Sequence, residues 1–124
     1  MKHCFSTLLI FLCFTTFGWC TTFHPVTLTV EYKENPSGID AVNPRLGWWI
    51  DANQHNIHQA AYHIQVFNSR HVSQSTEHLV WNSGKRYSPA NLSVAYGGQA
   101  LASSHKYYWR VRIWDQNGKV SRWS

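Results

Sequence analysis

Apolar and polar residues alternate along three stretches of this chain. They are VTLTVEY at residues 26–32, YHIQVFN at residues 62–68 and YYWRVRIW at residues 107–114. A period of two places successive side chains on opposite faces of a β-strand, so each stretch predicts a strand with one buried face. Val26 begins the first strand, and His63 is expected to face outward from the second.

Three shorter apolar runs predict further strands. These are Leu46–Ile50, which carries Trp48, then Leu79–Asn82 and Leu92–Tyr96. Residues that favour turns separate the runs, and no segment keeps an apolar stripe at helical spacing, including the short stretch Gln54–Ala61. Six short strands at intervals of about ten to fifteen residues predict an all-β, immunoglobulin-like sandwich of two sheets.

The first twenty residues have the pattern of a secretory signal peptide. Lys2 and His3 precede an apolar stretch at residues 4–17, and small residues follow near position 20. We therefore expect a signal peptide at residues 1–20, a sandwich module at residues 21–124 and export to the periplasm or beyond. Cleavage after Cys20 is predicted, with cleavage after Gly18 and a lipid anchor on Cys20 as alternatives. The apolar stretch is too short for a membrane span.

Length, charge and cysteine positions exclude several classes of protein. A length of 124 residues allows one domain, and the net charge of +5 contains no run of like charges that would indicate a nucleic-acid partner. All three cysteines, at positions 4, 13 and 20, lie in the predicted signal peptide. The mature chain would therefore have no disulfide, no cysteine nucleophile and no cysteine metal ligand.

No group of residues indicates catalysis, a metal or a cofactor. Inverting glycoside hydrolysis needs two carboxyl groups about 6.5–9.5 Å apart, whereas the acids here are expected at strand ends, in turns and in a loop: Glu31, Glu34, Asp40, Asp51, Glu77 and Asp115. His55 and His58 have a spacing that a metal could bridge on a helix, but no third ligand is evident. We predict no catalytic, metal or cofactor site.

Five motifs in order resemble the N-terminal module of secreted bacterial α-L-rhamnosidases. They are NPSGID at 35–40, PRLGW at 44–48, QAAYHI at 59–64, VWNSGK at 80–85 and YYWRVRIWDQNG at 107–118. The resemblance implies a fibronectin type III-like sandwich with Trp48 in the core. It also implies a tyrosine corner, with Tyr107 six residues after Leu101. The chain departs from the pattern at Gly47, where a serine is usual, and at Ser37, where a larger apolar residue is usual.

The resemblance also implies that the catalytic residues lie in a helical barrel downstream, which would be the partner of this module. We therefore expect the chain to be a fragment whose last strand, begun by VSRWS at 120–124, is incomplete. An incomplete strand would leave the edge of residues 107–114 open and the isolated chain poorly stable.

Aromatic and cationic residues near the C-terminus suggest a stacked arrangement. Arg110, Arg112, Trp114 and Trp123 are expected to alternate as a ladder, which resembles the Trp-Ser-x-Trp-Ser ladder of cytokine receptor domains. Val120 replaces the first tryptophan of that motif, so a shorter ladder is expected. Both a structural and a ligand-binding role remain open for it. The remaining aromatic candidates, which could stack on sugars or lie in the core, are Trp49, Trp81 and Tyr96.

Two functions follow from these patterns. The first is a non-catalytic accessory module of an exported α-L-rhamnosidase, expected to pack against the catalytic domain and to help orient a carbohydrate substrate. The alternative is an exported binding module that recognises carbohydrate or a protein without an attached enzyme.

Overall fold

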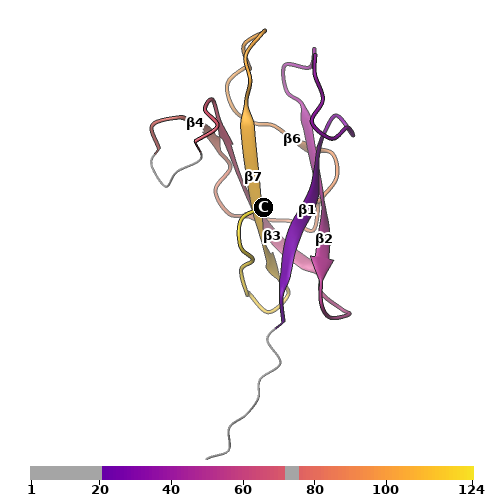
Figure 1. Ribbon diagram of the computed structural model, residues 1–124. Coiled ribbons are helices and arrows are strands. Elements are labelled where there is room, and N and C mark those ends of the chain that lie inside the picture. The colour runs from indigo at the N-terminus through magenta and orange to yellow at the C-terminus, as the bar shows by residue number, and fades with distance from the viewer. Residues whose placement is uncertain (1–20, 72–75) are drawn as a thin grey trace, which may run out of the picture.

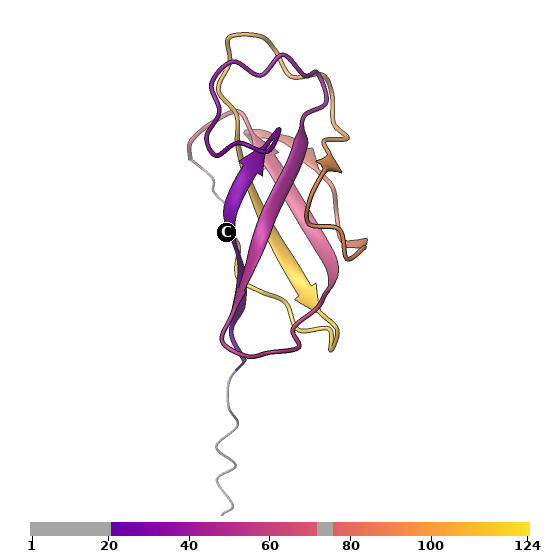
Figure 2. The same ribbon diagram turned by 90° about the vertical axis from the view of Figure 1, so that its right-hand side faces the viewer.

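The computed structural model describes residues 21–71 and 76–124, and the regular elements in these ranges are all β-strands. The strands form two antiparallel sheets that face each other as two layers (Figure 1, Figure 2). Their bounds are β1 (Phe23–Val30), β2 (Arg45–Ala52), β3 (Gln59–Phe67), β4 (Leu79–Asn82), β5 (Arg86–Tyr87), β6 (Val94–Ala95) and β7 (Tyr108–Asp115). The predicted all-β sandwich is confirmed.

The two sheets differ in how they are built. The first has the strand order β1-β2-β6. In the second, β3 is central, with β7 along one edge and β4 and β5 following each other along the other. The long pairing of β3 with β7 runs from Gln59↔Asp115 to Phe67↔Tyr108. This pairing makes β3 and β7 the framework of the second sheet.

Trp48 of β2 occupies the centre of the core and is fully buried. Its ring meets Tyr62 and Trp109 edge-on, with centroids 5.5 Å and 6.5 Å away. Edge-to-face packing matches the positive edge of one ring to the negative face of another. The other buried core residues come from both sheets: Phe23, Leu46, Ile64, Val66, Val94, Tyr96, Val111 and Ile113.

Gln59 provides the hydrogen-bond acceptor that the buried indole N–H of Trp48 needs. Trp48 Nε1 donates to Gln59 Oε1 at 2.9 Å, while Gln59 Nε2 donates to the carbonyl oxygens of Ser88 and Ala90. Asn91 adds a hydrogen bond from its side-chain amide to the Trp48 carbonyl oxygen, at 3.0 Å. A buried donor without a partner costs about 1–3 kcal/mol, so this network lets a tryptophan occupy the centre of the core.

The first strand differs from its prediction at both ends. It begins at Phe23, three residues earlier than expected, and ends at Val30. The pairing with β2 shifts register between Val26 and Thr29, where Thr27 has a φ of 48°. This β-bulge interrupts the alternation on which the prediction was based, because an extra residue changes which face the following side chains occupy.

Other boundaries also moved. Strand β3 begins at Gln59, three residues earlier than expected, and β2 extends past the predicted run at both ends. The described residues contain seven strands where six were expected, because the two-residue strand β5 has too little sequence to show a pattern. The run predicted at 92–96 contains only Val94–Ala95 as β6, and β7 lies one residue later than predicted. The strand predicted at Leu79–Asn82 matches β4.

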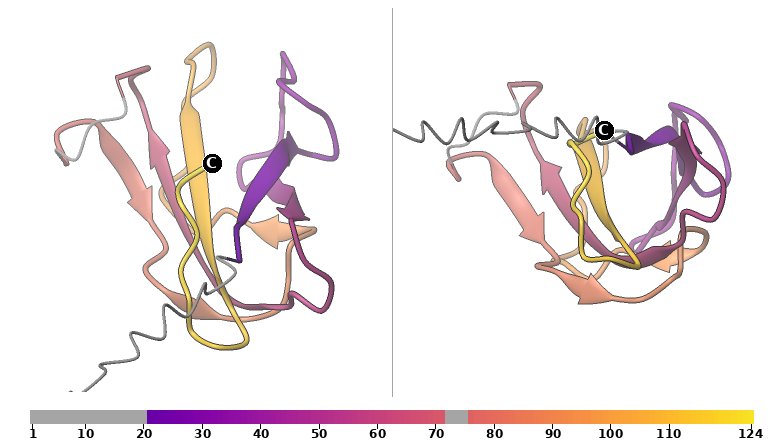
Figure 3. Two further views of the ribbon diagram at one scale, coloured as in Figure 1. Left: turned by 60° about the horizontal axis from the view of Figure 1, so that its bottom comes forward. Right: turned by 90° about the horizontal axis from the view of Figure 1, so that it is seen from below.

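The prediction that the edge of β7 is open is wrong for much of this strand. The chain turns back after Asp115 and residues 119–124 run beside β7 (Figure 3). The amides of Ser121 and Ser124 donate to the carbonyl oxygens of Ile113 and Val111, and the amides of Ile113 and Val111 donate to the hydroxyl oxygens of the same serines. The serine side chains thus replace the backbone acceptors of a strand.

Candidate functional site

The outer face of the β3–β7 pair carries a row of stacked cations and aromatic rings, here called the cation–aromatic ladder. Arg110 lies 4.3 Å and Arg112 4.6 Å from the Trp123 ring centroid, so this indole is held between two guanidinium groups. Arg112 also lies 5.3 Å from the Trp114 ring. The structure therefore brings together the four residues expected to stack.

The ladder is longer than the sequence suggested. Lys85, in the turn before β5, lies 4.7 Å from the Trp114 ring and 4.8 Å from the Tyr87 ring. At the opposite end, Arg110 lies 5.4 Å from the Phe67 ring. The expectation of a short ladder considered only β7 and the C-terminal motif. The additional members come from β3, from β5 and from the turn before β5. The full order is Tyr87, Lys85, Trp114, Arg112, Trp123, Arg110, Phe67.

His63 lies beneath this ladder. It faces outward from β3, as expected, opposite Arg112, but the ladder covers it and only 9% of its surface is exposed. The Trp123 and Trp114 rings lie 5.0 Å and 6.5 Å from it. Burial lowers the pKa of His63, a hydrogen bond with Asn82 opposes this effect, and the charges of Arg112 and Arg110 lower the pKa further.

The cations of the ladder have few polar partners. Arg110 donates from Nε and Nη2 to Gln65 Oε1, at 3.0 Å and 2.8 Å. Arg112 Nε is buried without a hydrogen-bond partner, and within residues 21–71 and 76–124 neither the Arg112 nor the Lys85 side chain forms a hydrogen bond or ion pair. Burial, and then the charge of Arg112, lower the pKa of Arg110. This face therefore carries positive charge that no described carboxylate balances.

Tyr107 anchors the loop that enters β7. Its hydroxyl oxygen accepts a hydrogen bond from the Ala102 amide at 2.9 Å, and Leu101 beside it packs against the core. This is the arrangement of a tyrosine corner, in which a tyrosine at the start of a strand bonds to backbone a few residues upstream. The two residues serve to hold the loop.

The three remaining aromatic candidates separate into two groups. Tyr96 is 2% exposed and meets Trp81 edge-on at 5.0 Å, so this pair belongs to the core and its border. Trp49 is 59% exposed on β2. Of the three, Trp49 has the most accessible ring.

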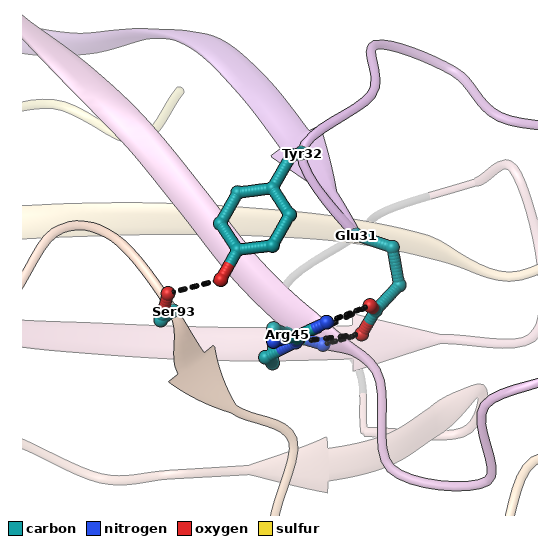
Figure 4. Close-up of polar contacts among 4 residues, drawn as sticks. All are labelled: Glu31, Tyr32, Arg45 and Ser93. Carbon is teal, nitrogen blue, oxygen red and sulfur yellow. Dashed lines mark hydrogen bonds and ion pairs between the residues drawn. The ribbon is translucent and has the colours of Figure 1, made fainter.

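A second cluster of polar contacts lies at one end of the first sheet (Figure 4). Arg45, at the start of β2, donates from Nη2 to Glu31 Oε2 at 2.7 Å and from its backbone amide to Glu31 Oε1 at 2.6 Å. The Arg45 guanidinium lies 4.9 Å from the Tyr32 ring, and the hydroxyl groups of Tyr32 and Ser93 are 2.6 Å apart. These hydrogen bonds from Arg45 lower the pKa of Glu31.

Glu31 and Tyr32 hold an unusual turn. The backbone groups of Val30 and Lys33 exchange two hydrogen bonds across it, and Glu31 and Tyr32 have φ values of 49° and 64°. Positive φ at both central positions defines a type I′ turn, which normally selects Asn and Gly. The alternating pattern predicted a strand at both positions, because neither glutamate nor tyrosine is a residue type that indicates positive φ.

No constellation for hydrolysis is present among the described residues. Glu31 is paired with Arg45, and Asp115 is 3% exposed, with Oδ1 accepting hydrogen bonds from the amides of Asn117 and Lys119. Asp40 lines a hollow of about 260 Å³ together with Glu31 and Lys33. The remaining acids are exposed: Glu34, Asp51 and Glu77.

The histidines do not gather into a metal centre. His55 and His58 are both exposed in the loop between β2 and β3, and no group of three metal-ligating side chains occurs within the described part of the chain. In the same residues, no helix has the length and apolar character needed to cross a bilayer.

The two facing sheets, the buried central tryptophan and the tyrosine corner define an immunoglobulin-like sandwich domain. The model of the family described as the Rha78A-like N-terminal immunoglobulin domain matches residues 25–124. The chain belongs to this family, and the resemblance noted in the sequence is confirmed.

Relatives in this family are much longer than this chain. It is 38% identical over 96 residues to an α-L-rhamnosidase of Streptomyces avermitilis, covering 77% of this chain and 9% of that protein. An α-L-rhamnosidase of Formosa agariphila is 38% identical over 92 residues, which is 74% of this chain and 10% of that protein. The chain thus spans about a tenth of the length of these relatives.

Solved structures of α-L-rhamnosidases contain the same fold. The crystal structure of the Streptomyces avermitilis α-L-rhamnosidase with L-rhamnose matches with a TM-score of 0.77 and 35% identity, covering 83% of this chain and 10% of that one. The α-L-rhamnosidase from Dictyoglumus thermophilum has a TM-score of 0.77 and 31% identity, covering 83% of this chain and 12% of that one.

Proposed function

We propose that this chain is the non-catalytic N-terminal accessory module of an exported α-L-rhamnosidase and that it packs against the catalytic domain of that enzyme. The observation that carries the proposal is the family match over residues 25–124, which corresponds to about a tenth of relatives named α-L-rhamnosidases. The dispersed, capped or paired carboxylates support a role without catalysis, because hydrolysis requires two carboxyl groups facing one substrate bond.

The outer face of β2 is the surface we assign to this packing. Trp49 is 59% exposed and Leu92 51% exposed, and Leu92 lies over Gly47, the next outward position along β2 from Trp49. Tyr32, 58% exposed, continues the row above Arg45. Large apolar side chains exposed in a row mark an interaction site more often than a solvated face.

A domain replacement tests the accessory role. Residues 25–124 would replace the matching segment of the Streptomyces avermitilis enzyme, and thermal stability and rhamnose release from an aryl rhamnoside would be measured. We expect the chimera to be more stable than the enzyme lacking the segment. Trp49→Ser should reduce this gain, whereas Tyr87→Ser, which alters an exposed ring on the other sheet, should preserve it. A chimera no more stable than the shortened enzyme would contradict the proposal.

We further propose that the protein is exported through a signal peptide at residues 1–20, which lie outside the described residues. The support comes from the charged start, the short apolar stretch and the restriction of cysteines to positions 4, 13 and 20. Mass spectrometry of exported material should find a new N-terminus near Thr21. An intact Met1 on cytoplasmic protein would contradict export.

An independent binding module is the second candidate. It is favoured by the way Ser121 and Ser124 satisfy the edge of β7 within the chain itself. Sequencing the gene beyond codon 124 distinguishes the candidates, since a continuing frame that encodes a helical barrel supports the accessory role and a stop codon supports the independent module.

A further inference from the structure

One end of the cation–aromatic ladder has the composition of an anion site. Lys85 and Arg112 both contact the Trp114 ring, at 4.7 Å and 5.3 Å from its centroid. Two positive groups held by one ring repel each other unless water, salt or a ligand compensates their charge.

Neither of these two cations is paired with an acidic side chain among the described residues. Within the described residues, neither the Lys85 ammonium nor the Arg112 guanidinium has a carboxylate partner, and the Arg45–Glu31 ion pair lies on the other sheet. Arg112 Nε is buried without a hydrogen-bond partner. Arg110 differs, because Gln65 accepts two of its hydrogen bonds. The ladder cations that lack a hydrogen-bond partner among the described residues are therefore at the Lys85–Trp114–Arg112 end.

The same end also presents flat ring surface. Tyr87 is 81% exposed and its ring lies 4.8 Å from Lys85. Trp114, whose ring also contacts Lys85, is half-buried. Aromatic side chains combine an apolar face with a polar tip, so they can pack against the C–H face of a pyranose ring while its hydroxyl groups stay in water.

We propose that Tyr87, Lys85, Trp114 and Arg112 form a binding site for an acidic oligosaccharide. Anionic groups of neighbouring sugars pair with Lys85 and with Arg112, and the ring of one of these sugars packs on Tyr87. Charge-assisted hydrogen bonds from two cations favour an anion over a neutral sugar. The choice of a sugar rather than an acidic peptide rests on the proposed function, whereas the anion site rests on the ladder alone.

Binding by the full chain tests this inference. Trigalacturonic acid, its fully methyl-esterified form and a sulfated trisaccharide would be titrated by calorimetry at low salt. We expect the acid to bind about tenfold more tightly than the ester, because the ester keeps the rings and removes the charges. Comparison with the sulfated sugar identifies whether carboxylate or sulfate is preferred. Equal binding of acid and ester would overturn the proposal.

Matched variants locate the site. Lys85→Gln is at an exposed position and should weaken binding of the acid about fivefold or more, whereas Lys106→Gln removes the same charge from an exposed loop and should leave affinity within about twofold. Equal losses in both variants would indicate attraction by net charge and would overturn the site. Tighter binding of a trimeric aspartate peptide would overturn the sugar assignment. The domain replacement does not depend on these titrations, so the two proposals fail separately.

Discussion

At the scale of single residues, the type I′ turn shows how side chains can compensate for an unfavourable backbone. Glu31 and Tyr32 both have positive φ, which costs a residue with a Cβ about 1–2 kcal/mol. The Glu31–Arg45 ion pair and the contacts of Tyr32 with Arg45 and Ser93 hold the turn in place. The backbone strain therefore lowers the stability of the turn, and these contacts raise it.

This opposition predicts an unusual order of variants at Tyr32. Tyr32→Ala loses the ring contacts and keeps the strain, so it should lower the free energy of unfolding by about 1–2 kcal/mol. Tyr32→Gly loses the same contacts but relieves the strain, and it should be about 1 kcal/mol more stable than Tyr32→Ala. Urea unfolding measures both values. A glycine variant less stable than the alanine variant would contradict the turn conformation.

His63 should make the free energy of unfolding depend on pH. Burial holds its pKa below the ordinary value of 6.5, so the unfolded chain binds a proton more readily than the folded chain. Stability should be greatest above pH 6.5 and should fall as the pH drops through 6.5 towards the lower folded pKa. Urea unfolding at pH 7.5 and pH 5 measures this loss.

His63→Gln should reduce the loss of stability between these two pH values, because glutamine does not titrate. His105→Gln, at an exposed position in the loop before β7, is the matched control. If the two variants change the pH dependence equally, His63 is not its source.

At the scale of elements, the segment after β7 replaces a strand by means of serine side chains. The amides of Val111 and Ile113 are in fully buried residues, and each donates to a serine hydroxyl at 3.0 Å. This arrangement explains why the edge is covered although residues 119–124 contain no regular strand. It also positions Trp123 between Arg110 and Arg112.

Removing one of these hydroxyl groups should be costly. Ser121→Ala leaves the Ile113 amide without its acceptor, and we expect a loss of about 1–3 kcal/mol in the free energy of unfolding. Ser103→Ala, at an exposed position in the loop before β7, should change stability by less than about 0.5 kcal/mol. Thermal unfolding monitored by tryptophan fluorescence measures both. Equal effects would show that the serine hydroxyl is not needed at the edge.

At the scale of the whole molecule, the two sheets present different exposed side chains, and the carboxyl groups of the described residues are not arranged for hydrolysis. The exposed row on β2 and the cation–aromatic ladder lie on opposite sheets. The surface proposed for packing and the proposed anion site therefore do not overlap.

The full chain alone should not release rhamnose from an aryl rhamnoside. The acids are paired, capped or exposed, and no two of the described ones face each other across an apolar pocket of the kind that raises the pKa of a general acid. A chromogenic assay against a buffer blank measures this. Turnover that disappears on changing one of the six acids would contradict the accessory role.

Local sequence was sufficient for the parts of the fold that depend on short-range periodicity. The buried face of β7 with Val111 and Ile113 was predictable because alternation indicates which side chains avoid water. The strand at Leu79–Asn82 followed from a short apolar run before turn residues, and the central position of Trp48 followed from the family resemblance. The family resemblance was likewise readable from motifs in order along the chain.

The tertiary structure decided which distant residues meet. The ladder gains Lys85, Tyr87 and Phe67 only when β3, β5 and β7 lie side by side, and His63 becomes buried only when Trp123 folds back over it. The Glu31–Tyr32 turn and the bulge at Thr27 depend on pairing with β2. Hydrophobic patterning specifies burial along one element, whereas cross-strand register and the path of the C-terminal segment are properties of contacts between elements.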